Sequence, residues 1–154
     1  MVAIPQYRAK KIDSDESVEG FFLPHEKANV IIVNHNARQM WAHRKSKTSY
    51  TNIDKLEYYE IDPSTLAIHF PDMKDSEGTK IFASLSEDGK GGDIVVRVDD
   101  TPFTDEKGNK RFSEWVATYE SCRISFCSTV NSPSISYPYF ESNKKYMKVT
   151  GIQE

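Results

Sequence analysis

The sequence predicts a mainly β protein, built as a small barrel or a curled sheet, with an α+β arrangement as the alternative. Short segments rich in β-branched and aromatic residues recur along the chain. Turn-forming clusters of Gly, Pro, Asn and Asp separate them at intervals of about 8 to 12 residues. No stretch sustains the 3.6-residue period of an amphipathic helix. Together these three observations favour many short strands and little helix.

Composition is that of a globular protein rather than a membrane or disordered one. The chain has 154 residues, of which 38% are hydrophobic and 28% charged, enough to bury a core without disulfides or metals. The longest clean apolar run, Val30 to Val33, is strand-sized and far below the length of a membrane span. Pro5 and charged residues near the N-terminus are unlike an export signal. We therefore expect a cytoplasmic protein that does not enter membranes.

The first third reads as extended segments joined by polar turns. Asp13 to Glu16 fits a hairpin turn, and Ala37 to Trp41 fits one helical turn, which the β-favouring Thr48 to Thr51 ends. The strands expected here are Ile4 to Ile12, Val18 to Leu23, and Val30 to Val33. We expect a β-rich N-terminal subdomain over residues 1–63.

The remaining residues, 64–154, contain the most regular β pattern. Glu57 to Ile61 leads into a turn at Asp62 to Thr65, because proline fixes φ and the Asp and Ser side chains bond nearby backbone. Asp93 to Val98 alternates as a strand with one buried face. The turns expected are 75–78, 87–92 and 105–110, and the further strands are 65–70, 80–85, 115–119, 123–130 and 146–152.

The chemistry-bearing residues predict no catalytic or metal site and no cofactor. Cys122 and Cys127 are an odd number apart in a predicted strand, so their side chains point to opposite faces, and two packed thiols are favoured over a disulfide. The histidines lack zinc-ligand spacing, and ordinary surface or turn roles are favoured for them: His25, His35, His43 and His69. Gly89, Gly91 and Gly92 precede a strand rather than a helix, so they are turn residues, not a phosphate loop. We therefore expect that the protein is not an enzyme.

A basic segment with an interleaved tryptophan is the one candidate nucleic-acid surface. Its residues are Arg38, Trp41, Arg44, Lys45 and Lys47, which would supply phosphate contacts and a stacking ring. A solvated basic loop with Trp41 packed in the core is the favoured competing interpretation. The net charge of -3 also argues against binding by wholesale phosphate neutralisation. A second candidate surface is the aromatic run Tyr137 to Phe140, for which core packing is again favoured.

The order of several motifs resembles the YopX family of phage and prophage proteins over nearly the whole chain. The motifs are Tyr7 to Lys10, Val18 to Phe21, Tyr59 to Thr65, Lys74 to Phe82, Gly92 to Val95 and Val149 to Ile152. The resemblance implies an SH3-like barrel at residues 64–154, after the smaller β-rich part, in a protein encoded by a phage or prophage in a bacterial host cell. Two departures are the extra residues 83–90 and Gly91, where the family has Glu. The family has no agreed catalytic residues, so the resemblance assigns none.

Two functions follow as expectations. The first is a binding module that assembles with copies of itself, since the basic segment at residues 38–47 lies next to an acid-rich segment at residues 54–100 and open strand edges favour association. The alternative is a nucleic-acid-binding accessory protein that uses the basic segment. The first expectation names a homo-oligomer as the partner, and the second names nucleic acid.

Overall fold

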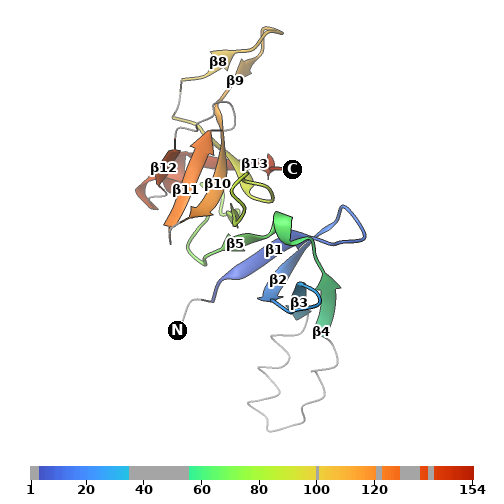
Figure 1. Cartoon of the computed structure of the whole chain (residues 1–154). Coiled ribbons are helices and arrows are strands. Elements are labelled where there is room, and N and C mark those ends of the chain that lie inside the picture. Colours follow the sequence, from blue (N-terminus) through green and yellow to red (C-terminus); the bar gives the residue numbers. More distant parts are fainter. Residues whose placement is uncertain (1–3, 35–55, 100, 121–122, 129–135, 139–140) are drawn as a thin grey trace.

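The computed structural model describes residues 4–34, 56–99, 101–120, 123–128, 136–138 and 141–154 (Figure 1). The protein is mainly β, as the sequence predicts. The helices described are two short 3-10 turns, η2 (Pro63–Thr65) and η3 (Glu141–Tyr146). None of the described helices has the length and apolar character needed to cross a bilayer. The predicted helical turn at 37–41 lies outside the described residues.

The first four strands form an antiparallel sheet in chain order: β1 (Gln6–Lys10), β2 (Ser17–Leu23), β3 (Val30–Asn34) and β4 (Leu56–Glu60). The sheet curls, because an isolated bridge joins Lys11 to Ile61 and the Ile12 N–H donates to the Glu60 carbonyl at 3.0 Å. The concave side encloses a core of Ala9, Val18, Ile31, Ile61 and Leu66. The opposite side faces away from this core.

A short connection carries the sheet into the second half of the chain. Asp62 caps η2, with its Oδ1 accepting from the Ser64 N–H at 2.9 Å. Strand β5 (Ala67–His69) then pairs with β1 on one side and with β6 (Ala83–Ser84) on the other. Strand β6 pairs in parallel with β10 at Ser84 and Thr118. One sheet therefore runs through both halves of the molecule.

The second half surrounds its own core. Neighbouring strands lie in the order β13 (Met147–Ile152), β7 (Asp93–Arg97), β10 (Glu114–Glu120), β11 (Arg123–Ser128) and β12 (Ser136–Pro138). The core residues are Ile68, Met73, Ile81, Ala83, Val95, Ala117, Phe126 and Met147. Among the described strands the pairing does not close into a barrel. The SH3-like architecture and the boundary between residues 63 and 64 remain predictions.

A separate two-stranded ribbon projects from the body at the end opposite β4 (Figure 1). It consists of β8 (Phe103–Thr104) and β9 (Lys110–Arg111). Asp105 shapes its tip, since Oδ1 accepts from the Lys107 and Asn109 N–H groups at 3.0 and 2.8 Å. Gly108 supplies the positive φ of 82°. The predicted hairpin tip is therefore confirmed.

One expected strand is much shorter than predicted. The segment at residues 80–85 contributes only the two residues of β6 to the sheet. The reason is that the Phe82 N–H donates to the carboxylate of Asp93 at 2.8 Å, so a side chain takes the place of a strand partner. Gly89 and Gly91 have positive φ, which turn glycines commonly supply.

Candidate functional site

The five basic-segment residues named as a nucleic-acid surface lie outside the described residues: Arg38, Trp41, Arg44, Lys45 and Lys47. So do His35, His43 and Cys122, and nothing is described of the side chains from Tyr137 to Phe140. Cys127 is half-buried in β11, with its Sγ 3.5 Å from the Thr118 Oγ1. The His25 Nδ1 accepts from the Lys27 N–H at 3.1 Å, as a turn histidine does. The candidate site therefore lies elsewhere among the described residues.

A groove of about 420 Å³ opens where β1 and β2 meet β7 and β13. Residues from five parts of the chain line it, including Arg8, Glu19, Lys80, Phe82, Asp93 and Ile152. Its size is within the range of small-molecule sites in proteins. We call it the junction groove, because it lies between the two cores.

The floor of the junction groove is a buried ion pair. The Arg8 Nη2 donates to the Asp93 Oδ1 at 2.7 Å and to the Gly91 carbonyl at 2.9 Å. The two side chains are only 10% and 2% exposed. The guanidinium also lies over the Phe82 ring, 4.5 Å from its centroid. Both Asp93 oxygens accept hydrogen bonds, because Oδ2 takes the Phe82 N–H.

Burial shifts the pKa of two groups at this floor. It raises the pKa of Asp93, and the neighbouring Arg8 charge and the Phe82 N–H oppose that rise. Behind Phe82, His69 is buried with its ring centroid 5.3 Å from the Phe82 ring. Burial lowers the pKa of His69. The imidazole is therefore neutral near pH 7, with Nδ1 donating to the Ile81 carbonyl at 2.9 Å.

The rim of the groove carries partly exposed charges. The Lys80 Nζ donates to the Gln6 Oε1 at 2.8 Å and lies 3.6 Å from the Glu19 Oε2. On the β13 side, a Cβ atom added at Gly151 would meet nothing within 4 Å. The groove is therefore open at Gly151.

A buried carboxylate, Asp75, fixes the turn at residues 75–79, whose last residue, Thr79, lines the groove. Asp75 Oδ1 accepts from the Glu77 and Thr79 N–H groups at 2.9 Å, and Oδ2 accepts from the Val149 N–H at 3.0 Å. The Ser76 N–H also donates to the Met147 carbonyl at 2.9 Å. These hydrogen bonds join the turn to β13, so the position of the turn beside this strand is fixed.

An exposed apolar surface lies on the outer face of the N-terminal sheet. In the strand register Phe21 is opposite Ile32, and Ile32 is opposite Tyr58, while Leu23 is opposite Val30. Directly opposite residues share a face. Phe21, Leu23 and Tyr58 are 47%, 48% and 63% exposed. We call these five residues the apolar strip; Glu19 of the groove precedes Phe21 on the same face of β2.

The sequence contains a signal for the apolar strip, which is separate from the alternating pattern of a half-buried strand. The runs Phe21 to Leu23 and Val30 to Val33 are apolar at consecutive positions, and neighbouring side chains of a strand point to opposite faces. Such runs therefore place apolar side chains on both faces. Arg8 had no comparable signal, since its partner Asp93 is far away in the sequence.

The described residues hold no cluster of three or more His, Cys, Asp or Glu side chains that could bind a metal ion. Asp88 accepts a hydrogen bond from the Lys90 N–H at 3.0 Å in a turn. No family model, curated protein or solved structure matches this chain.

Proposed function

We propose that this protein is a non-catalytic binding module, encoded by a phage or prophage, that associates with copies of itself through the apolar strip. The supporting observation is the row formed by Phe21, Ile32 and Tyr58, whose two outer members are about half or more exposed. Large apolar side chains that gather on one exposed face are typical of an interaction surface. Single scattered ones would carry no such meaning.

A second copy is the occupant that fits the strip. Its five residues carry no formal charge at neutral pH. The two acids on the same face, Glu19 before Phe21 and Glu60 opposite Val30, are exposed at its edges, where they keep their contact with solvent. A two-fold arrangement brings the same patch from each copy, which is the commonest symmetry of soluble oligomers. Two sheet faces can pack with interdigitated side chains at a separation of about 10 Å. The strip is small beside a stable dimer interface, so we expect weak association.

Backbone amide NMR spectra recorded over a series of protein concentrations test this surface. From dilute to concentrated protein, we expect amide shifts at Phe21, Ile32 and Tyr58, because these residues enter the interface. Amides of the projecting ribbon, such as Lys107, should stay unchanged and serve as the internal control. Concentration-independent spectra throughout, or shifts centred on the ribbon, would contradict the proposed interface.

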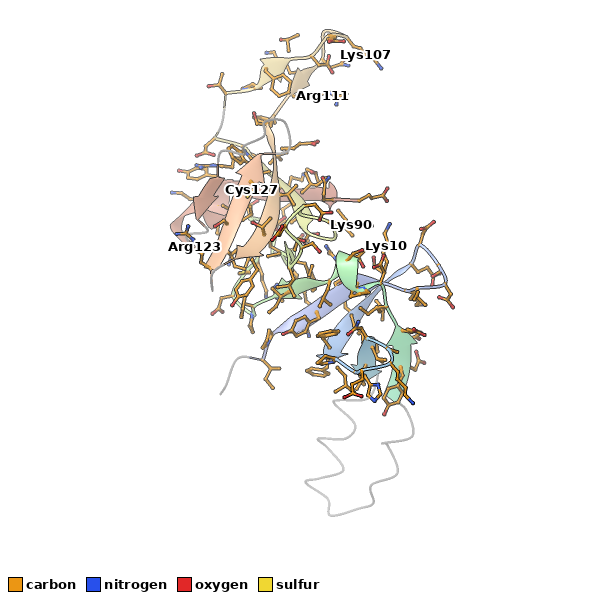
Figure 2. The ribbon with its side chains drawn as sticks, viewed as in Figure 1. Lys10, Lys90, Lys107, Arg111, Arg123 and Cys127 are labelled. Carbon is orange, nitrogen blue, oxygen red and sulfur yellow. The ribbon has the colours of Figure 1, made fainter. Side chains whose placement is uncertain are left out.

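Binding to nucleic acid is the second candidate, and one observation favours it. The ribbon of β8 and β9 presents Lys107, Lys110 and Arg111 away from the body, where Figure 2 labels Lys107 and Arg111. A two-stranded ribbon has the width that the DNA major groove admits. Asp105 and Glu106 offset part of this charge, and the Arg111 Nε is already 2.7 Å from the Asp105 Oδ2.

A salt titration with duplex and single-stranded DNA tests this candidate. We expect the protein to bind DNA at low salt and to bind more weakly as the salt concentration rises. The double variant Lys107→Ala, Lys110→Ala should bind more weakly than the wild type. A matched control is Lys148→Ala, which removes an exposed cation from β13. If the protein does not bind DNA at low salt, or if the control variant loses as much DNA affinity as the double variant, nucleic-acid binding through the ribbon is contradicted.

A further inference from the structure

The floor of the junction groove has more hydrogen-bond donors than acceptors. A guanidinium has five N–H donors and no acceptor. Both described bonds of Arg8 leave from Nη2, and no described residue accepts from its Nε or Nη1. Each oxygen of Asp93 already takes a hydrogen bond, and the Glu19 carboxylate that also lines the groove pairs with Lys80 rather than with Arg8. A ligand that supplies acceptors would complete this floor.

The guanidinium is also held in one orientation. Asp93 and the Gly91 carbonyl fix its Nη2, while the Phe82 ring supports its face at 4.5 Å. A donor that is already ordered loses little freedom when a ligand arrives, so more of the interaction appears as affinity. A planar guanidinium suits a carboxylate particularly well.

The remaining surfaces of the groove define the rest of the ligand. Lys80 adds a second positive charge on the rim, where its side chain is 43% exposed and lies 3.6 Å from the carboxylate of Glu19, which also lines the groove. Val149 and Ile152 line the β13 side with apolar groups, and Gly151 leaves the space between them open. The groove therefore combines ordered donors, a cation and an apolar wall.

We infer that the junction groove binds a carboxylate that carries a short apolar tail. The carboxylate accepts hydrogen bonds from Arg8 and Lys80, and the tail lies along Val149 and Ile152. Such a group belongs either to a small carboxylic acid or to the free end of a peptide with an apolar last residue. This site is separate from the apolar strip, and it stands whether or not the protein self-associates.

Titration of the whole protein with hexanoate, followed by backbone amide NMR, is the first test. We expect saturable shifts at Gly151, Ile152 and Lys80, with an affinity in the millimolar range for so small a probe. Hexanamide has the same shape without the charge, and acetate has the charge without the tail. Both should bind more weakly. Equal shifts with hexanamide, or none with hexanoate, would overturn the inference.

A substitution at Gly151 separates the site from general surface effects. Gly151→Leu adds a side chain at a position where a Cβ atom meets nothing within 4 Å, and it should weaken hexanoate binding about tenfold or more, because that side chain enters the groove. Lys148→Leu adds the same side chain at an exposed position of β13 outside the groove and should bind as wild type does. Lys80→Gln should weaken binding by about fivefold at most, since an exposed charge contributes little. Full binding by Gly151→Leu would refute the site.

A peptide arm identifies the source of the carboxylate. The probe is an N-acetylated tetrapeptide that ends in leucine, compared with the same peptide carrying a C-terminal amide. Tighter binding of the peptide acid than of hexanoate assigns a chain end as the ligand, and the reverse order assigns a small acid. Equal binding of the peptide acid and its amide would contradict carboxylate recognition.

Discussion

Individual buried polar residues hold distant parts of this chain together. Arg8 on β1 and Asp93 on β7 pair at 2.7 Å with almost no exposure, and Asp75 is 1% exposed with backbone donors on both oxygens. The described contacts of these three residues are structural.

Removal of the charge on Asp93 should be strongly destabilising. In Asp93→Asn the buried Arg8 guanidinium keeps its charge without a counterion, which typically reduces the free energy of unfolding by about 3–5 kcal/mol. Asp99→Asn is the matched control, because Asp99 pairs with Arg97 at 2.6 Å nearer the surface and should cost about 1 kcal/mol or less. Urea denaturation measures both. Similar losses in the two variants would contradict the assigned role of the buried pair.

His69 should make stability depend on mildly acidic pH. Burial lowers its pKa below the usual 6.5, so the unfolded chain binds a proton more readily than the folded protein does. The free energy of unfolding should therefore fall as pH drops from 6.5 through the folded pKa of His69.

Denaturation at a series of pH values measures this effect. His69→Gln removes the titrating group, so the free energy of unfolding of this variant should change less between pH 7 and pH 5 than that of the wild type. Each unit by which folding lowers the pKa of His69 corresponds to about 1.4 kcal/mol. His25→Gln is the control, since His25 is exposed in a turn. A slope unchanged in His69→Gln would show that another group causes it.

At the scale of elements, one turn motif appears twice with different roles. Asp75 and Asp105 each accept from the N–H groups two and four residues later, and each turn has a glycine with positive φ, Gly78 and Gly108. The first turn is docked on β13 through Val149. The second closes the projecting ribbon and contacts Arg111 instead.

The two turns should respond unequally to the same substitution. Asp75→Ala leaves three backbone donors without their acceptor next to the core, and we expect a loss of about 2–4 kcal/mol in the free energy of unfolding. Asp105→Ala affects an exposed ribbon that solvent can satisfy, so the expected loss is below about 1 kcal/mol. Chemical denaturation compares them directly. Equal losses would mean that docking on β13 contributes little.

At the scale of the whole molecule, one continuous sheet joins two separate cores. Strand β5 pairs with β1 and β6, and the Arg8–Asp93 pair bridges the same region. The junction groove lies at this seam, and the apolar strip extends from it over the convex face of the curled N-terminal sheet. Function would therefore depend on the arrangement of both halves rather than on either one.

The sequence predicts the β class and most turns because these depend on local residues. Pro63, Gly89 and Asp105 act within a few positions of themselves. The groove could not be predicted in this way. Arg8 meets Asp93, and Asp75 meets Val149, only after distant strands have paired. The shortened strand at residues 80–85 has the same origin, because a distant carboxylate occupies the Phe82 N–H.

Sedimentation velocity across a wide concentration range is the most direct measurement of self-association through the apolar strip. Wild-type protein should move from monomer toward dimer as concentration rises, and Tyr58→Lys should remain monomeric, because it puts a charge into the interface. Val98→Lys is the matched control, since Val98 is 50% exposed outside the strip and should dimerise as wild type does. A strict wild-type monomer at high micromolar concentration, or unaltered dimerisation of Tyr58→Lys, would contradict the account.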